Sequence, residues 1–266
     1  SYPSSDLPVW LEHNSAGAIA AAQVIRLSSA VGLEQLQAGD WAVLDAAEPQ
    51  DLDAIGSAVI AELAQGRRHL CQSAASLLNG LSGIRSRLLG PAELPSIQAG
   101  GVVLVGSHVP LTDQQLTALL EEPQCTGVEF SLDSDARDWP ALTAELEVIR
   151  AQGRTPVLFS SRGERSGLSP QQQRQLASAM AQVVLGLEPP LGYVIAKGGT
   201  TSLTLLAEGL GFQQLRLLGQ LQPGLSIVQP EQPHGRFGAL PVVTFPGNLG
   251  DQDSLRRCWQ QLEQLR

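Results

Sequence analysis

The sequence has little clustered positive charge and no long apolar run. Its net charge is −9, and its basic residues form no group larger than doublets such as Arg67-Arg68 and Arg256-Arg257. A nucleic-acid groove needs a concentrated basic stripe to neutralise phosphates, so we expect no nucleic-acid partner. The longest apolar runs, such as Val102–Val105, are far too short to span a bilayer, and no secretory leader opens the chain. We therefore expect a cytoplasmic protein with no membrane partner.

Several familiar chemical signatures are also missing. The cysteines Cys71, Cys125 and Cys258 are far apart and have no CxxC neighbour, which excludes a disulfide scaffold and predicts no zinc site. No GxSxG or HExxH motif is present, so the common hydrolase sites are absent. The pair Ser107-His108 has two interpretations: a catalytic histidine beside a hydroxyl, or a histidine that serves only packing or the surface.

The sequence does contain short apolar runs that alternate with amphipathic stretches. This alternation is typical of an α/β fold, a layered domain with a mostly parallel central sheet flanked by helices. The expected strands are 41–44, 69–71, 101–105, 128–132, 156–159, 193–196, 215–218 and 242–245. The expected helices are 49–65, 74–81, 112–120, 141–151, 170–185, 202–210 and a last one after residue 251. Residues 82–100 are expected to be a connecting loop and an internal boundary, and 223–238 an irregular excursion.

Three of these helices carry capping signals at their starts. Thr112 with Gln115 forms a capping-box pattern, and Ser169 before a proline predicts an N-cap. Asp251 or Asp253 is expected to cap the last helix.

The segment 193–202 carries the sharpest functional signal, because a buried strand runs directly into Gly198-Gly199-Thr200-Thr201-Ser202. Glycines let the backbone approach a ligand closely, and free N–H groups at a helix start favour phosphate. The same pattern also fits a plain helix start at which Thr201 or Ser202 is only an N-cap. It is neither a P-loop nor a dinucleotide fingerprint. Lys197 either reaches a phosphate or is a solvated lysine at a strand end.

Two other expected strands end in similar turns, Gly106-Ser107-His108 and Gly247-Asn248-Leu249-Gly250. In open α/β sheets, ligands bind outside the carboxyl ends of the strands. We therefore expect the three turns to meet around one ligand, although each one alone is also a plain loop.

Several stretches taken together, in this order, resemble the four-carbon acid sugar kinases, which phosphorylate acids such as threonate and erythronate. The resemblance covers nearly the whole chain and is carried by 41–45, 51–54, Gly106–Val109, Gly198–Ser202, Pro223-Gly224 and Gly247–Asp251. It implies a two-domain kinase whose C-terminal half binds ATP with Mg²⁺. The residues that it assigns to the nucleotide are Ser107, Gly198, Gly199, Thr200, Thr201, Gly247 and Asn248; it assigns no catalytic residue and no protein metal ligand.

The chain departs from this family in three places. The family's N-terminal Asp-Asp-x-Thr-Gly motif, which serves the sugar acid, is not in this sequence. The family usually has glutamate where this chain has Thr200, and Lys-Ser where this chain has Phe245-Pro246. These departures favour binding over catalysis.

The resemblance predicts that residues 1–38 are a linker from a missing N-terminal substrate domain and that residues 39–266 form the nucleotide-binding domain. The expected function is the ATP-binding part of a kinase for a hydroxyl of a four-carbon sugar acid, incomplete without that domain. The alternatives are a module that binds a nucleotide or phosphometabolite without turnover, and a structural domain whose turns are only caps. A homodimer is compatible with the sequence, which does not fix the oligomeric state.

Overall fold

The computed structural model describes residues 4–85, 87–130, 139–162 and 169–266. The chain divides into two compact units, Ser1–Ser86 and Arg87–Arg266. The division lies inside the 82–100 segment that the sequence marks as a boundary, whereas the expected boundary between residues 38 and 39 falls within the first unit. No helix in the described ranges is long and apolar enough to cross a membrane.

The first unit is built from short elements around a small core. Its helices and strands are α1 (Leu7–Asn14), β1 (Ile25–Leu27), β2 (Ala42–Leu44), α2 (Pro49–Ala64) and α3 (Ser76–Ser82). Strands β1 and β2 pair in parallel, and the buried core consists of Leu33, Ile55, Val59 and Leu77. The expected strand at 69–71 is wrong: this stretch pairs with no strand, and Leu70 is fully exposed.

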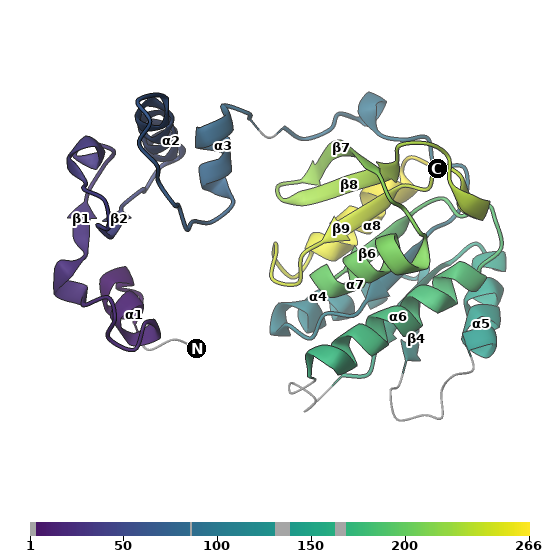
Figure 1. The fold of residues 1–266 in the computed structure, drawn as a ribbon. Coiled ribbons are helices and arrows are strands. Elements are labelled where there is room, and N and C mark those ends of the chain that lie inside the picture. The colour runs from purple at the N-terminus through teal and green to yellow at the C-terminus, as the bar shows by residue number, and fades with distance from the viewer. Residues whose placement is uncertain (1–3, 86, 131–138, 163–168) are drawn as a thin grey trace. The chain divides into compact units, whose positions relative to one another are not determined.

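The second unit contains a seven-stranded sheet with the order β4-β5-β3-β6-β9-β8-β7 (Figure 1). Strands β4, β5, β3, β6 and β9 are parallel, and β8 and β7 complete the sheet in antiparallel pairings. The strands are β3 (Val102–Val105), β4 (Cys125–Phe130), β5 (Thr155–Ser160), β6 (Val194–Lys197), β7 (Leu215–Gln222), β8 (Leu225–Pro230) and β9 (Val242–Phe245). The mostly parallel sheet confirms the predicted α/β class.

Helices cover both faces of this sheet because successive side chains of a buried strand point to opposite faces. Val194 and Ala196 of β6 pack in the core with α5 (Trp139–Ala151), α6 (Pro170–Gly186) and the segment after α7 (Gly199–Thr204). Ile195 packs on the other face with α4 (Pro110–Leu120) and α8 (Ser254–Glu263). The sheet is therefore the middle layer of three.

Two differences from the expected elements have local causes. Strand β8 lies in the stretch expected to be irregular, because Pro223-Gly224 forms the turn of a β7–β8 hairpin, with Gly224 at a φ of 79°. Strand β4 begins at Cys125, and the expected strand residues 131–132 lie outside the described ranges.

The capping predictions have mixed outcomes. Ser169 is confirmed as an N-cap, since its Oγ accepts the Gln172 N–H at 3.3 Å. Asp253 is the residue before α8, but its side chain makes no capping bond, so the predicted cap is wrong for this residue. The Asp251 carboxylate accepts from the side-chain hydroxyl of Ser254 at 2.9 Å.

Candidate functional site

The turns after β3, β6 and β9 lie side by side at one edge of the sheet. These three strands are parallel neighbours, so their carboxyl ends meet there. The Gly106 N–H donates to the Lys197 carbonyl at 3.1 Å, and the Gly198 N–H donates to the Phe245 carbonyl at 2.8 Å. The seven residues singled out from the sequence all lie in these turns: Ser107; Gly198, Gly199, Thr200 and Thr201; Gly247 and Asn248.

The turn after β6 presents the start of a helix. Gly198 has a φ of 122°, a conformation that favours glycine, and α7 begins at the next residue, three residues earlier than expected. The Ser202 hydroxyl lies 2.9 Å from both the Ala196 and the Gly198 carbonyl oxygens, so it binds acceptors and does not cap the helix. The interpretation of Thr201 or Ser202 as the N-cap is therefore wrong, because Gly198 holds that position.

The three turns together hold a row of backbone donors. The first N–H groups of a helix have no partner within it, which applies to Gly199 and the two threonines that follow. In the part of the chain that the structure describes, the N–H groups of Ser107, Gly247 and Asn248 also have no protein acceptor. Backbone N–H groups that lie together without a protein acceptor bind anions, phosphate above all.

Thr112 and Gln115 on α4 hold the turn after β9 in place. The Thr112 hydroxyl lies 3.1 Å from the Gly247 carbonyl oxygen and 3.0 Å from the Ser107 hydroxyl, and Thr112 is fully buried. The Gln115 amide donates to the carbonyls of Leu249 and Asp251 at 3.0 and 2.7 Å. The predicted capping box is therefore wrong, because both side chains bond across the fold and α4 begins earlier, at Pro110.

Lys197 is the only lysine in these 266 residues, and it is completely buried. Its ammonium donates to the carbonyl oxygens of Pro246 at 2.7 Å and Gly247 at 3.0 Å, and lies 4.1 Å from the centre of the Phe245 ring. Burial lowers the pKa of Lys197 to about 8. The interpretation of Lys197 as a solvated lysine is therefore wrong, because its ammonium is buried beneath the β9 turn.

His108 and Arg162 lie beside the β3 turn. The His108 Nε2 is 3.1 Å from the Ser160 hydroxyl at the end of β5, and not paired with Ser107. Burial and the Arg162 charge lower the pKa of His108. Arg162 donates to the carbonyls of Ser107 and, at 3.2 Å, Val105, and pairs with Asp113 at 3.2 Å. This arginine therefore fixes the shape of the turn that carries Ser107.

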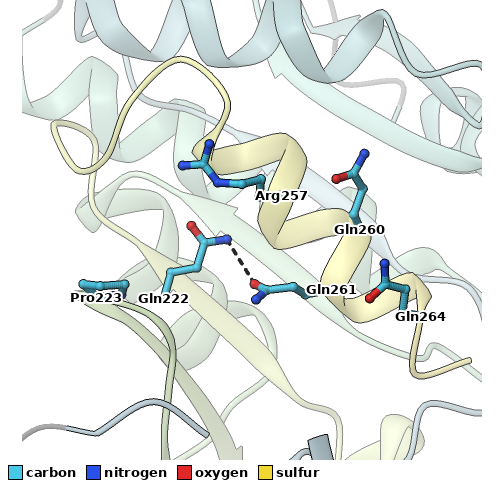
Figure 2. A pocket seen from close by; sticks show the side chains of 6 residues that line it. All are labelled: Gln222, Pro223, Arg257, Gln260, Gln261 and Gln264. Carbon is cyan, nitrogen blue, oxygen red and sulfur yellow. Dashed lines mark hydrogen bonds between the residues drawn. The ribbon is translucent and has the colours of Figure 1, made fainter. Parts of the chain in front are cut away.

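A shallow hollow of about 320 Å³ lies elsewhere, between the β7–β8 turn and α8 (Figure 2). It is lined by four glutamines, an arginine and a proline: Gln222, Gln260, Gln261, Gln264, Arg257 and Pro223. Gln222 donates to Gln261 at 3.0 Å, and Arg257 pairs with Asp251 at 2.8 Å. None of the seven predicted residues lines this hollow, so it adds nothing to the candidate site.

The described residues offer no preformed metal cage. In the ranges given above, no three His, Cys, Asp or Glu side chains lie together so that they could hold an ion. The side-chain oxygens on the residues of the N–H row are the hydroxyls of Ser107, Thr200 and Thr201 and the amide oxygen of Asn248, all uncharged. The donor set therefore fits an anion rather than a bare cation.

Comparison with known families decides what kind of protein this is. Residues 102–255 match the family described as "Nucleotide-binding C-terminal domain", and residues 1–81 match "Sugar-binding N-terminal domain". The chain belongs to the four-carbon acid sugar kinase family. The second match also corrects an expectation, because a sugar-binding N-terminal domain is represented in this chain and is not missing.

This four-carbon acid sugar kinase family member is similar to one curated protein in sequence and to two solved structures in fold. The chain is 29% identical to a D-threonate kinase of Bordetella bronchiseptica over 187 residues, which are 66% of this chain and 45% of that protein. A crystal structure of a domain-swapped dimer from Bordetella bronchiseptica with bound citrate is 24% identical with a TM-score of 0.51, covering 90% of this chain and 58% of that one. A Haemophilus influenzae structure is 16% identical with a TM-score of 0.51, covering 84% and 53%. The chain spans about half the length of these relatives.

Lys197 lies next to one of the departures from the family pattern. Lys197 is the cross-strand partner of Phe245, the first of the two positions where the resemblance leads us to expect Lys-Ser. In this chain, a lysine therefore lies beside that position, on the neighbouring strand β6. The sequence held a usable signal for Lys197, namely a lone lysine at the end of an apolar strand. No local signal connected Thr112, which fitted a helix cap, or Arg162 to the site.

Proposed function

We propose that the second unit binds the phosphates of a nucleotide, ATP with Mg²⁺, at the row of N–H donors after β3, β6 and β9. The observation that carries the proposal is that three turns meet and that each of them holds N–H groups with no protein acceptor in the described residues. The residues proposed to hold the phosphates are Ser107, Gly198, Gly199, Thr200, Thr201, Gly247 and Asn248.

We further propose that the full-length protein is a kinase that transfers the terminal phosphoryl group of ATP to a hydroxyl of a four-carbon sugar acid. The D-threonate kinase relative supports this substrate class. Phosphoryl transfer requires mainly that donor and acceptor are positioned and that the developing charge is neutralised. The N–H row would hold and orient the donor, and the sugar-binding unit would present the acceptor.

Mg²⁺ would enter this site together with the nucleotide. It binds most protein sites through one or two carboxylates plus substrate phosphates and keeps several waters. Thr200 and Thr201 carry hydroxyls at the start of α7, in the turn after β6. The ion would neutralise charge between the phosphates, and these hydroxyls would orient its waters or the phosphate oxygens.

The test combines calorimetric titration of the chain with ATP and an activity assay of the full-length protein on D-threonate, D-erythronate and their stereoisomers. We expect ATP to bind to the chain and one of these acids to be phosphorylated. Absence of ATP binding at millimolar concentration contradicts the nucleotide site, and binding without any phosphorylated acid contradicts the kinase activity.

A second candidate function is a module that binds a nucleotide or phosphometabolite without turnover. Thr200 favours it, because the turn lacks the carboxylate that the family usually has there. The assay above separates the two functions, since this module would bind the ligand tightly and leave every acid unchanged. If the protein is such a module, restoring the carboxylate with Thr200→Glu in the full-length protein should produce measurable phosphorylation of one of the acids.

We also propose a cytoplasmic homodimer. The related Bordetella bronchiseptica structure, which is a domain-swapped dimer, motivates the oligomeric state. Light scattering of the full-length protein at micromolar concentration gives the mass directly, and a monomer mass contradicts the proposal.

A further inference from the structure

A buried positive charge lies directly beneath the candidate phosphate site. Lys197 is 0% exposed, and no carboxylate in the described part of the chain pairs with its ammonium. Burying an ion without a counter-ion is costly, and the lowered pKa of about 8 reflects this cost. Two backbone carbonyls and the face of Phe245 are its only direct partners among these residues.

The geometry of the β9 turn connects this charge to the site. The carbonyl oxygens of Pro246 and Gly247 both point at the ammonium. In a trans peptide the N–H lies opposite the C=O, and the cis bond in the described ranges is Pro189-Pro190, far from this turn. The N–H groups of Gly247 and Asn248 therefore point away from Lys197. These are two of the donors that have no protein acceptor.

We infer that Lys197 makes the site prefer ligands with several negative charges, and that it acts through the two peptide units of the β9 turn without touching the ligand. The inference rests on the proposed nucleotide site and adds the origin of its charge preference. The ammonium fixes both peptide units with their positive ends outward, and bound phosphates supply the negative counter-charge that the ammonium lacks. Lys197 is thus a positioning residue in this account.

Other charged groups near the turns do not share this role. His108, Arg162 and Asp113 lie on the side of β3 and β5, and Asp251 lies beyond the β9 turn; none of them forms a hydrogen bond or ion pair with the Lys197 ammonium. A bound polyphosphate is therefore the group expected to perturb Lys197 most.

A single lysine makes the inference directly measurable. When the whole chain is labelled with ¹³C-lysine, its lysine side-chain signal comes from Lys197 alone. We expect the pKa read from this signal to rise by at least one unit when the protein is saturated with sodium tripolyphosphate or ATP without Mg²⁺. An unchanged pKa at saturation overturns the inference.

Variants test the same point through affinity. Lys197→Met removes the charge and keeps an apolar stem over Phe245, and Lys197→Gln keeps a donor for the carbonyls should the methionine variant fold poorly. We expect either variant to bind ATP and tripolyphosphate about tenfold more weakly, and AMP less than threefold more weakly. Thr112→Val is the matched control, because it also loses a bond to Gly247 but no charge, and it should weaken all three ligands by one common factor.

The outcomes separate the inference from the site on which it rests. ATP binding by the wild type, with an equal loss for AMP and ATP in the lysine variants, leaves the nucleotide site standing and reduces Lys197 to a structural role. Wild-type protein that binds neither ATP nor tripolyphosphate refutes both. Binding of tripolyphosphate without ATP keeps the role of Lys197 and refutes the nucleotide site.

Discussion

The turn after β6 and the turn after β9 both present backbone N–H groups at the same edge of the sheet, but by different means. At the β6 turn, a helix starts immediately after Gly198, and its first N–H groups are free because no earlier turn of helix precedes them. At the β9 turn there is no helix, and a buried ammonium binds the carbonyls from beneath. Secondary structure orients the donors in one case and a side chain does so in the other.

The two turns should therefore differ in their sensitivity to substitutions elsewhere in the fold. A helix start is maintained by its own hydrogen bonds and by packing of the buried Leu205 and Leu206 that follow, so its donors should tolerate changes outside the turn. The β9 turn depends on groups supplied by Lys197 of β6 and Thr112 of α4, so distant substitutions should alter it. Substitutions at the two turns should therefore affect binding in different ways.

The largest effect is expected from filling the space in front of the helix start. Gly199 is exposed, and a Cβ built on it meets no heavy atom within 4 Å, so Gly199→Leu should leave the fold intact and block the N–H groups of α7. We expect ATP affinity to fall about a hundredfold, or about 2.7 kcal/mol. Calorimetric titration measures the affinity, and a thermal melt measures the stability.

Two controls accompany this prediction. Gly199→Ala should give an intermediate loss, and Ala144→Leu, at an exposed position of α5, should give none. Wild-type affinity in Gly199→Leu contradicts the role of the β6 turn and leaves the β9 turn as the main anion-binding element.

A somewhat smaller effect is expected at the β9 turn. A Cβ at Gly247 would lie 2.6 Å from the Ser107 hydroxyl, so Gly247→Ala must displace this hydroxyl from its bond with Thr112 or shift the turn that carries it. We expect about a twentyfold loss of ATP affinity and about 1–3 kcal/mol of stability. In the Ser107→Ala background the clash is relieved, so the same substitution should cost less, and additive losses in a double-mutant cycle contradict this steric explanation.

At this edge, the strands and turns could be predicted from the sequence, whereas the side chains that hold the turns in place could not. Strands β3, β6 and β9 are short apolar runs that end in glycine turns, and such local patterns identify both the strand and its end. Thr112 was predicted to be a helix cap because local sequence favours that use, whereas it bonds to Gly247, 135 residues away. No local pattern reports a partner at that separation.

The β7–β8 hairpin and the first unit show the same limit. Pro223 and Gly224 are typical of loops, and only the pairing of β8 with β7 and β9 identifies a strand in the stretch between residues 223 and 238. Strand β1 has only three residues, too few for a periodic pattern, so residues 1–38, which contain it, resembled a linker. The assignment of the seven site residues to a nucleotide stays a prediction.

A moderate effect is expected from pH, and only through the β9 turn. The pKa of Lys197 is lowered to about 8 by burial, so the ammonium is charged below that pH and neutral above it. Phosphate groups, with a second pKa near 6, are already ionised there. ATP affinity should therefore fall about tenfold as the pH rises from about 7 to 9.5, and Lys197→Met should remove this dependence.

The stability of the ligand-free protein should change in the opposite direction. Because the folded pKa of Lys197 is below its unfolded value, the unfolded chain binds more protons between about pH 8 and 10.5, and the contribution of this residue to the free energy of unfolding rises with pH there. Urea unfolding of the wild type and of Lys197→Met at several pH values isolates this contribution. If the free energy of unfolding depends on pH in the same way in both proteins, this dependence arises from groups other than Lys197.

The smallest effect is expected from Thr112→Val, compared with Thr117→Val on the same helix. Thr112 is buried and bonds to the Gly247 carbonyl, whereas the exposed Thr117 bonds only to the Asp113 carbonyl one turn earlier. The Gly247 carbonyl keeps its bond from Lys197 in Thr112→Val, so we expect only about a threefold loss of ATP affinity and about 1 kcal/mol of stability. Thr117→Val should change neither quantity measurably. A loss from Thr112→Val as large as that from Gly199→Leu would mean that the hydroxyl, rather than the ammonium, orients the β9 turn.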